Sequence, residues 1–238
     1  MIMLQMTGGM GNQMFTYALY RSLRQKGKEV CIEDFTHYDT PEKNCLQTDD
    51  VYMIGYFQSE RYFEKAVFDL RKDFSFAWNT FPEKAKKLRE QMQAETSVSL
   101  HIRRGDYMNG KFASIYGNIC TDAYYEAARR YMKEHFGDCR FYLFTDDAEW
   151  GKQQESEDTV YVDASEGAGA YVDMALMSCC RHHIIANSSF SWWGAWLDEN
   201  PDKTVIAPAK WLNISEGKDI YAGLGNCLID ANGSVQCV

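Results

Sequence analysis

The sequence predicts an α/β protein built from parallel sheets, with a small first lobe and a larger second one. The chain has 238 residues, of which 45% are hydrophobic and 14% aromatic, enough to bury one sizeable core or two small ones. After about residue 96, short apolar runs of strand length alternate with longer stretches of helical periodicity. This alternation is typical of a parallel sheet covered by helices. A highly charged helical stretch before it predicts lobes at residues 1–95 and 96–238.

The first lobe opens with a strand, a glycine turn and a helix. Gly8, Gly9 and Gly11 predict the turn, and Gly27 is the expected end of the helix. A dinucleotide-binding G-x-G-x-x-G fingerprint is excluded because Met14 stands where the third glycine belongs. The elements expected in this lobe are a strand at 1–6, a helix at 12–26, a strand at 30–32, a strand at 51–57 and a helix at 62–74.

The second lobe begins after the charged helix at 83–94, which Pro82 opens. Trp192, Trp193 and Trp196 are spaced as on a helix packed into the core, and core packing is more common for such residues than a sugar-binding platform. The residues beyond Asn213 are rich in glycine and predict no element. The strands expected here are 98–102, 140–145, 159–162, 183–186 and 204–206, and the helices are 121–135, 169–180 and 191–199.

Composition and charge exclude several classes of protein. The chain carries 25 basic and 34 acidic residues, a net charge of −9, so it lacks the basic field of a generic nucleic-acid binder. An anion could still be bound by a few well-placed cations. No run approaches the roughly 20 apolar residues of a membrane span, and the N-terminus does not read as a signal peptide.

The eight cysteines show neither C-x-x-C spacing nor a Cys/His ligand pattern. A structural zinc site is therefore not expected. Without a secretory signal, we interpret the cysteines as reduced thiols of a cytoplasmic protein, with pairing of Cys227 and Cys237 left open.

The segment HIRRGDY at residues 101–107 follows a predicted strand. His101 and Arg103 lie on one face of that strand because alternate side chains share a face. Arg103 is at the end of the strand, where open α/β sheets bind ligands, and a guanidinium fork matches the oxygens of a diphosphate. The alternative is a surface arginine pair bridged to Asp106, which is common for exposed charges.

Three further groups are candidates for binding. Ser188 and Ser189 follow a strand and precede a helix, so they either cap that helix or help to form an anion site at its N-terminus. Asp173 lies beside an apolar helical stripe, where a carboxylate usually has a partner. Guanine could be that partner, because its two parallel N–H groups can donate to the two oxygens of the Asp173 carboxylate. The alternative is that Asp173 forms an ion pair or is a charge at the N-terminus of its helix. Asp146 and Asp147 end a strand but form no D-x-D triplet, so no metal is inferred.

Five segments together resemble the family-11 glycosyltransferases, the α-1,2-fucosyltransferases, in the expected order over nearly the whole chain. The segments are GGMGNQMF at 8–15, GYFQS at 55–59, HIRRGDY at 101–107, FYLFTDD at 141–147 and ANSSFSWWGAWL at 186–197. The resemblance implies a GT-B-like fold of two Rossmann-like lobes, with the acceptor on the first lobe and GDP-fucose on the second.

The resemblance also implies the roles of individual residues. Arg103 would hold the β-phosphate. The resemblance does not name the base that deprotonates the acceptor; Asp106 is the first choice because it is close in sequence to Arg103, and an ion pair between Asp106 and Arg104 is an equal alternative. Asp173 would read guanine. The remaining donor-binding candidates are His101, Arg104, Asp146, Asp147, Asn187, Ser188, Ser189 and Phe190, and the acceptor-side candidates are Gly9, Gly11, Asn12 and Gln13.

The activity implied is inverting transfer of L-fucose from GDP-β-L-fucose to the 2-hydroxyl of a terminal galactoside, without a metal or other cofactor. Alternatives are a transferase for another GDP-sugar or linkage, and a non-catalytic binding module. The expected partners are GDP-fucose and a galactose-containing glycan, with no nucleic acid. The expected type is bacterial, without the membrane anchor of animal members, and cytoplasmic, with peripheral contact to the inner membrane left open.

Overall fold

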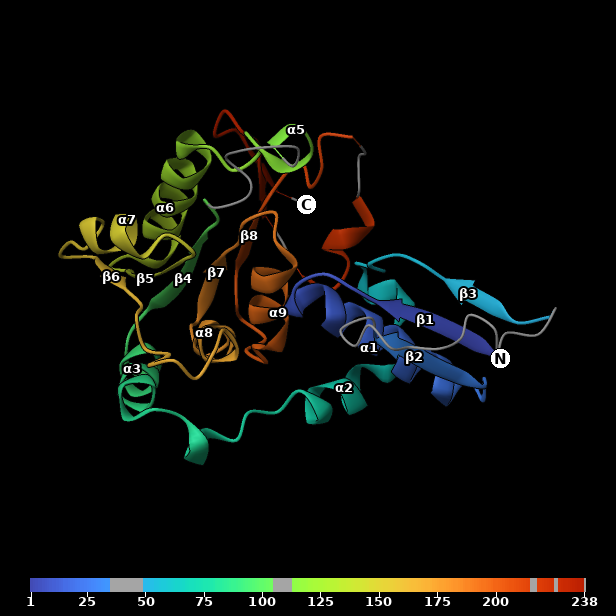
Figure 1. Ribbon diagram of the computed structural model, residues 1–238. Coiled ribbons are helices and arrows are strands. Elements are labelled where there is room, and N and C mark those ends of the chain that lie inside the picture. Colours follow the sequence, from blue (N-terminus) through green and yellow to red (C-terminus); the bar gives the residue numbers. More distant parts are fainter. Residues whose placement is uncertain (35–48, 105–112, 215–217, 225–226, 238) are drawn as a thin grey trace. The chain divides into compact units, whose positions relative to one another are not determined.

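The computed structural model describes residues 1–34, 49–104, 113–214, 218–224 and 227–237. The chain divides into two compact units, Met1–Ser75 and Phe76–Val238. Each unit contains a sheet of parallel or mainly parallel strands with helices packed on it, as drawn in Figure 1. The predicted α/β class with a small first lobe is therefore confirmed.

The first unit is built around the strand β1 (Ile2–Met6). β1 pairs in parallel with β2 (Val30–Asp34) on one side and with β3 (Val51–Met53) on the other. The helix α1 (Met10–Gln25) connects β1 to β2, and Leu4, Leu19 and Val30 form a small core between sheet and helix. These elements match the predicted strand–turn–helix–strand order.

Two expectations for the rest of this unit are wrong. The strand predicted at 51–57 ends at Met53, since Gly55 and Phe57 have positive φ angles of 158° and 50°, which strands do not adopt. The helix predicted at 62–74 is divided into three helical elements, and only the last is an α-helix within the predicted range. These are η2 (Glu60–Tyr62), η3 (Glu64–Ala66) and α2 (Val67–Asp73).

The boundary between the units also differs from the prediction. After η4 (Trp78–Thr80), the charged helix α3 (Glu83–Ala94) has the predicted bounds, yet it belongs to the second unit. Its buried residues Ala85, Leu88 and Met92 pack with residues of the second sheet, among them Tyr142 and Phe144. The division therefore falls after Ser75, not after Glu95, because the apolar stripe of α3 is buried in the larger core.

The second unit contains, within the described residues, a seven-stranded sheet in the order β10-β9-β8-β7-β4-β5-β6. All neighbouring strands are parallel except β9 and β10, which are antiparallel. The strands are β4 (Ser97–Ile102), β5 (Arg140–Thr145), β6 (Thr159–Tyr161), β7 (His182–Ile184), β8 (Val205–Pro208), β9 (Cys227–Ile229) and β10 (Val235–Cys237). The last two lie in the glycine-rich tail where the sequence predicts nothing.

Helices cover both faces of this sheet. The long helix α6 packs on one face against Val98, Leu100 and Phe141, whereas α3 and α8 pack on the other face around Tyr142 and Phe144. The helices of this unit are α5 (Ala113–Tyr116), α6 (Asp122–Phe136), α7 (Ala148–Gln153), α8 (Tyr171–Met177), α9 (Ser189–Leu197) and η6 (Lys218–Tyr221).

The three tryptophans of α9 are core residues, as expected. Trp192, Trp193 and Trp196 are at most 1% exposed, and the Trp192 indole donates a hydrogen bond to the carbonyl of Ile220 at 2.7 Å. Cys227, one of the two cysteines whose pairing was left open, is buried in the core, and its pairing stays open. No helix within the described ranges is long and apolar enough to cross a membrane.

Candidate active site

The predicted donor-binding residues gather at the carboxyl edge of the second sheet. From β4 the chain adds β5 and β6 on one side, then crosses over and adds β7 and β8 on the other side. The strand order therefore reverses between β4 and β7, and open α/β sheets bind ligands at such a switch point. His101 and Arg103 come from the end of β4, and Asn187 and Ser188 follow β7.

Arg103 and Arg104 are held by a carboxylate from the next strand. Ile102 lies opposite Thr145 in the parallel ladder, which brings the residues that follow both strands together. Asp146 forms an ion pair with Arg103, whose Nε lies 3.2 Å from Asp146 Oδ2, and Asp146 Oδ1 accepts a hydrogen bond from the Arg104 backbone N–H at 2.8 Å. The side chain of Arg103 is 35% exposed, so a guanidinium is fixed at the sheet edge while it remains open to solvent.

Arg104 is held separately from Arg103. Its Nε lies 3.2 Å from Asp147 Oδ2, and its guanidinium lies over the Trp150 ring at 4.5 Å. Asp147 also caps α7 by accepting from the Trp150 backbone N–H at 3.1 Å. Arg104 and Asp147 thus hold one another in place after β4 and β5, and their role in donor binding stays a prediction. Asp106, the predicted base, lies outside the described residues.

His101 is a buried neutral imidazole. It is 5% exposed, and burial, together with the charge of Arg103, lowers its pKa to about 4. Its ring lies 5.8 Å from that of Phe190, and its carbonyl accepts from the Tyr125 hydroxyl at 3.1 Å. Within the described residues, the buried His101 Nδ1 has no hydrogen-bond partner. Buried polar atoms rarely stay unpaired, so this nitrogen is suited to contact a ligand.

Asn187 and Ser188, which follow β7, form hydrogen bonds that stabilise the neighbouring loops and helix. The Asn187 side-chain amide donates to the carbonyls of Tyr116 at 3.1 Å and Trp211 at 3.2 Å, which ties two loops to the end of the strand. Ser188 caps α9 by accepting from the Phe190 backbone N–H at 3.3 Å. The capping alternative is thus present at Ser188. A phosphate role for Ser188 or Ser189 stays a prediction.

Asp173 lies in the first turn of α8, the helix that follows β6. Burial and the nearby charge of Asp163 raise the pKa of its carboxyl to about 6. No hydrogen bond or ion pair joins this carboxylate to another described residue. The ion pair considered from the sequence is therefore not found in the described part of the chain, and the role in guanine recognition stays a prediction.

A buried polar network below this edge was missed by the sequence reasoning. His183 of β7 is fully buried between the Ser99 hydroxyl, 2.8 Å from its Nδ1, and Asp198, 3.0 Å from its Nε2. The network links β4, β7 and the end of α9 directly below the residues that carry Arg103 and Ser188. The only available signal was a histidine pair inside an apolar strand, and the partners are remote in sequence.

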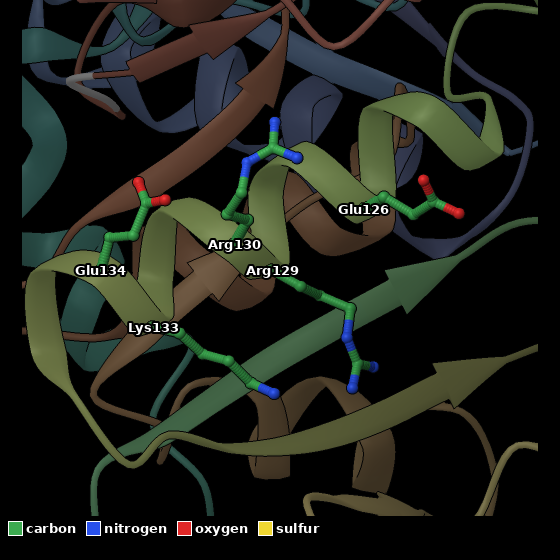
Figure 2. A pocket seen from close by; sticks show the side chains of 5 residues that line it. All are labelled: Glu126, Arg129, Arg130, Lys133 and Glu134. Carbon is green, nitrogen blue, oxygen red and sulfur yellow. The ribbon is translucent and has the colours of Figure 1, made fainter.

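A groove of about 470 Å³ is lined by five residues of α6. Figure 2 shows Arg129 and Lys133 extending from one side of the helix and Arg130 and Glu134 from the other. Arg129 and Lys133 both pair with Asp158, at 2.9 Å and 2.5 Å. None of the predicted site residues lines this groove, so we assign the groove no part in the site.

The predicted acceptor-side residues lie together in the first unit. Gly9 is the N-cap residue of α1, and its carbonyl accepts from the backbone N–H groups of Asn12 and Gln13. The Gln13 side chain donates to the Gly8 carbonyl at 2.9 Å, and Gly11 is buried. Their contacts with a substrate remain untested.

The relatives found by comparison with known proteins are glycosyltransferases. An α-1,2-colitosyltransferase from Escherichia coli is 41% identical over 79% of this chain and 65% of its own length. The O-antigen biosynthesis glycosyltransferase WbnK from Escherichia coli is 42% identical over 49% of this chain and 39% of its own. A galactoside α-(1,2)-fucosyltransferase from Saimiri boliviensis boliviensis is 25% identical over 46% of this chain and 31% of its own. The chain spans less than two thirds of each relative.

Among solved structures, the fucosyltransferase NodZ from Bradyrhizobium matches with a TM-score of 0.40 and 13% identity, covering 82% of this chain and 92% of that one. The model of glycosyl transferase family 11 matches residues 16–221, most of the chain. That match includes the strand-end arginines and the serine-containing turn after β7. The chain belongs to glycosyl transferase family 11.

Proposed function

We propose that this glycosyltransferase transfers L-fucose from GDP-β-L-fucose to the 2-hydroxyl of a terminal galactoside, with inversion, in the synthesis of an oligosaccharide or polysaccharide. Family membership and the α-1,2-specific names of relatives support the reaction type. The observation that carries the proposal is Arg103, fixed by Asp146 at the switch point of the sheet, together with the buried His101 Nδ1, which has no hydrogen-bond partner among the described residues.

The chemistry of the step requires a cation at this point. When the bond between sugar and phosphate breaks, negative charge develops on the leaving GDP. A preorganised guanidinium stabilises that charge, and one such donor is worth about 3 kcal/mol of barrier. The ion pair with Asp146 fixes Arg103 before substrate binds, so little reorganisation is needed. In this proposal Arg103 supplies the positive charge, and the enzyme uses no metal or other cofactor.

Other residues would complete the donor site. The neutral imidazole of His101 offers Nδ1 to the donor without adding a charge that competes with Arg103. Ser188 and Ser189, at the start of α9, would contact a phosphate together with the N–H groups of the helix terminus. Asp173 would accept the two parallel hydrogen bonds of guanine. Phe190, beside His101, would line the site.

The acceptor would be activated by a base that removes the proton from its attacking hydroxyl. Asp106, close in sequence to Arg103, is our first choice for this base. Attack opposite the leaving GDP converts the β-linked donor into an α-linked product. We place the acceptor on the first unit, at the turn that holds Gly9, Gly11, Asn12 and Gln13. A cytoplasmic location with peripheral contact to the inner membrane stays a prediction.

A second donor is supported by a specific observation: the 41% identity to an α-1,2-colitosyltransferase. Colitose is L-fucose without the 3-hydroxyl, so donors that carry these two sugars on the same nucleotide differ by one hydrogen-bonding group. A site that pairs that hydroxyl would reject the deoxy sugar strongly, whereas an apolar site would discriminate weakly. The ratio of kcat/KM for the two GDP-sugars decides between them.

The decisive experiment is incubation with GDP-fucose, or its 3-deoxy analogue, and a panel of galactosides, with the linkage of the product determined by NMR. We expect an α-1,2 product. Release of GDP in the absence of acceptor separates an enzyme from a binding module, which would release none. A product with another linkage would assign a different specificity within the family.

Removal of the guanidinium tests its role directly. Arg103→Ala should lower kcat by about a hundredfold or more while the protein stays folded, because transition-state stabilisation of about 3 kcal/mol is lost. The matched control is Arg130→Ala, which removes an exposed arginine on α6 and should leave turnover unchanged. Near-normal turnover by Arg103→Ala would refute the proposed role.

Guanine recognition has its own readout. Asp173→Asn should weaken GDP binding about tenfold or more, since one acceptor of a bidentate pair becomes a donor, and should change UDP binding much less. Isothermal calorimetry with both nucleotides measures this difference. Equal GDP affinity for the variant and the wild type would exclude Asp173 from the nucleotide site.

A further inference from the structure

We propose that Tyr56, Asn12 and Gln58 form a carbohydrate subsite on the first unit, which binds one neutral pyranose ring of the acceptor. The proposal rests on the proposed function for the identity of the acceptor. It goes beyond that function by assigning the ring-binding surface to a segment, residues 54–58, that has no role in the donor site. Three observations on the first unit support it.

The first observation is strain in the backbone. Phe57 has a φ angle of 50°, in the left-handed region that a bulky residue rarely adopts. Its side chain packs against the core of the first unit and meets the Tyr62 ring edge-on at 5.8 Å. Strained residues of this kind persist where the fold enforces them, and they cluster at functional sites. Here the strained turn directs Phe57 inward and leaves the flanking Tyr56 41% exposed.

The second observation is that Tyr56 and Asn12 meet across a glycine. A Cβ atom on Gly8 would lie 3.1 Å from Tyr56 Cε1 and 2.8 Å from Asn12 Nδ2. Gly8 also has a φ angle of 82°, which favours glycine. The ring and the amide are therefore brought together over a backbone position that has no room for a side chain.

The third observation is the orientation of the amides. Gln58 Nε2 donates to Asn12 Oδ1 at 2.7 Å, which fixes the Asn12 side chain. Asn12 Nδ2 then keeps its two N–H donors for another group, and it has no hydrogen-bond partner within the described residues. The exposed tyrosine ring thus lies next to fixed amide donors.

These groups match one class of ligand. The apolar C–H face of a pyranose packs on an aromatic ring. The hydroxyls of the sugar accept hydrogen bonds from amide groups of the protein, and sites for small ligands commonly combine an apolar surface with a few such polar groups. The cluster of Gly8, Asn12, Tyr56 and Gln58 contains no carboxylate, ammonium or guanidinium group, so it favours a neutral sugar over a phosphate. Ile54, two residues before Tyr56, is also exposed.

Steady-state kinetics with GDP-fucose and lactose test the subsite. Tyr56→Ala should raise the KM for lactose at least tenfold and leave the KM for GDP-fucose and the acceptor-independent release of GDP unchanged. Tyr56→Phe keeps the ring and should stay within about threefold of the wild type. Phe68→Ala is the matched control, because it removes an aromatic ring that is 71% exposed on α2 of the same unit.

Saturation-transfer NMR with methyl β-D-galactopyranoside tests the sugar-binding subsite separately from the proposed fucose transfer. Signals of the galactoside that appear with the wild type and vanish with Tyr56→Ala support the subsite, even if the wild type transfers another sugar. Gly8→Ala, which inserts a methyl group between the ring and the amide, should abolish them as well. A wild type that transfers fucose to lactose while Tyr56→Ala and Gly8→Ala keep its KM within twofold would overturn the subsite and leave the proposed function intact.

Discussion

Acidification from pH 7 to pH 5 should affect two buried groups of the candidate site with opposite sign. His101 has a pKa lowered by burial to about 4, against an ordinary value of 6.5. Below pH 6.5 the unfolded chain therefore binds a proton that the folded protein does not, and the free energy of unfolding falls as the pH falls toward 4. From the two pKa values, His101 contributes a loss of about 2 kcal/mol between pH 7 and pH 5.

Asp173 acts in the other direction. Its pKa is raised from 3.8 to about 6, so the folded protein binds a proton before the unfolded chain does. The free energy of unfolding therefore rises as the pH falls through 6 toward 3.8. Between pH 7 and pH 5 this gain is about 1 kcal/mol. In the wild type the two effects partly cancel, and single variants are needed to separate them.

The assay is urea unfolding at pH 7 and pH 5, followed by the fluorescence of the buried tryptophans of α9. We expect His101→Gln to lose about 2 kcal/mol less than the wild type between the two pH values, and Asp173→Asn to lose about 1 kcal/mol more. His182 and His183, whose pKa values are also lowered by burial, are present in all three proteins and cancel in the comparison. Parallel pH dependence of the wild type and His101→Gln would refute the buried neutral imidazole.

Two further predictions concern packing below the site. Gly194→Ala should lower the free energy of unfolding by about 1–3 kcal/mol, because the new Cβ would lie 2.8 Å from Met177 Cβ, and the urea midpoint measures the loss. Asp198→Ala should cost about 1–3 kcal/mol, since it leaves the buried His183 Nε2 without its partner. A thermal midpoint of Asp198→Ala equal to that of the wild type would show that the Ser99–His183–Asp198 network does not stabilise the fold.

Local patterns in the sequence predicted the elements that bury a regular stripe. The helix at 83–94 and the strands of the second sheet from β4 to β8 were placed by apolar periodicity and by their boundaries, because both depend on neighbouring residues. The prediction failed where the backbone departs from such periodicity. The strained turn at Phe57 ended β3 early, and the helix expected at 62–74 is divided into three helical elements.

The candidate site was predictable to the extent that strand ends converge. The sequence placed His101 and Arg103 at the end of one strand and Ser188 after another, and the parallel sheet brings them to one edge. It did not predict that Asn187 pins the loops at Tyr116 and Trp211. Such contacts depend on loops distant in sequence, and no local pattern records them.

By itself, the sequence determined the α/β class and the family, because periodicity, charge and motif order are properties of neighbouring residues. Which residues are partners depends instead on how the strands are ordered in space. Asp146 comes to Arg103 because β4 and β5 are adjacent in register, although 43 positions separate the two residues, and His183 meets Ser99 across β4 and β7. Strand order brings remote residues within hydrogen-bond distance, and burial then sets the charge state that each one carries.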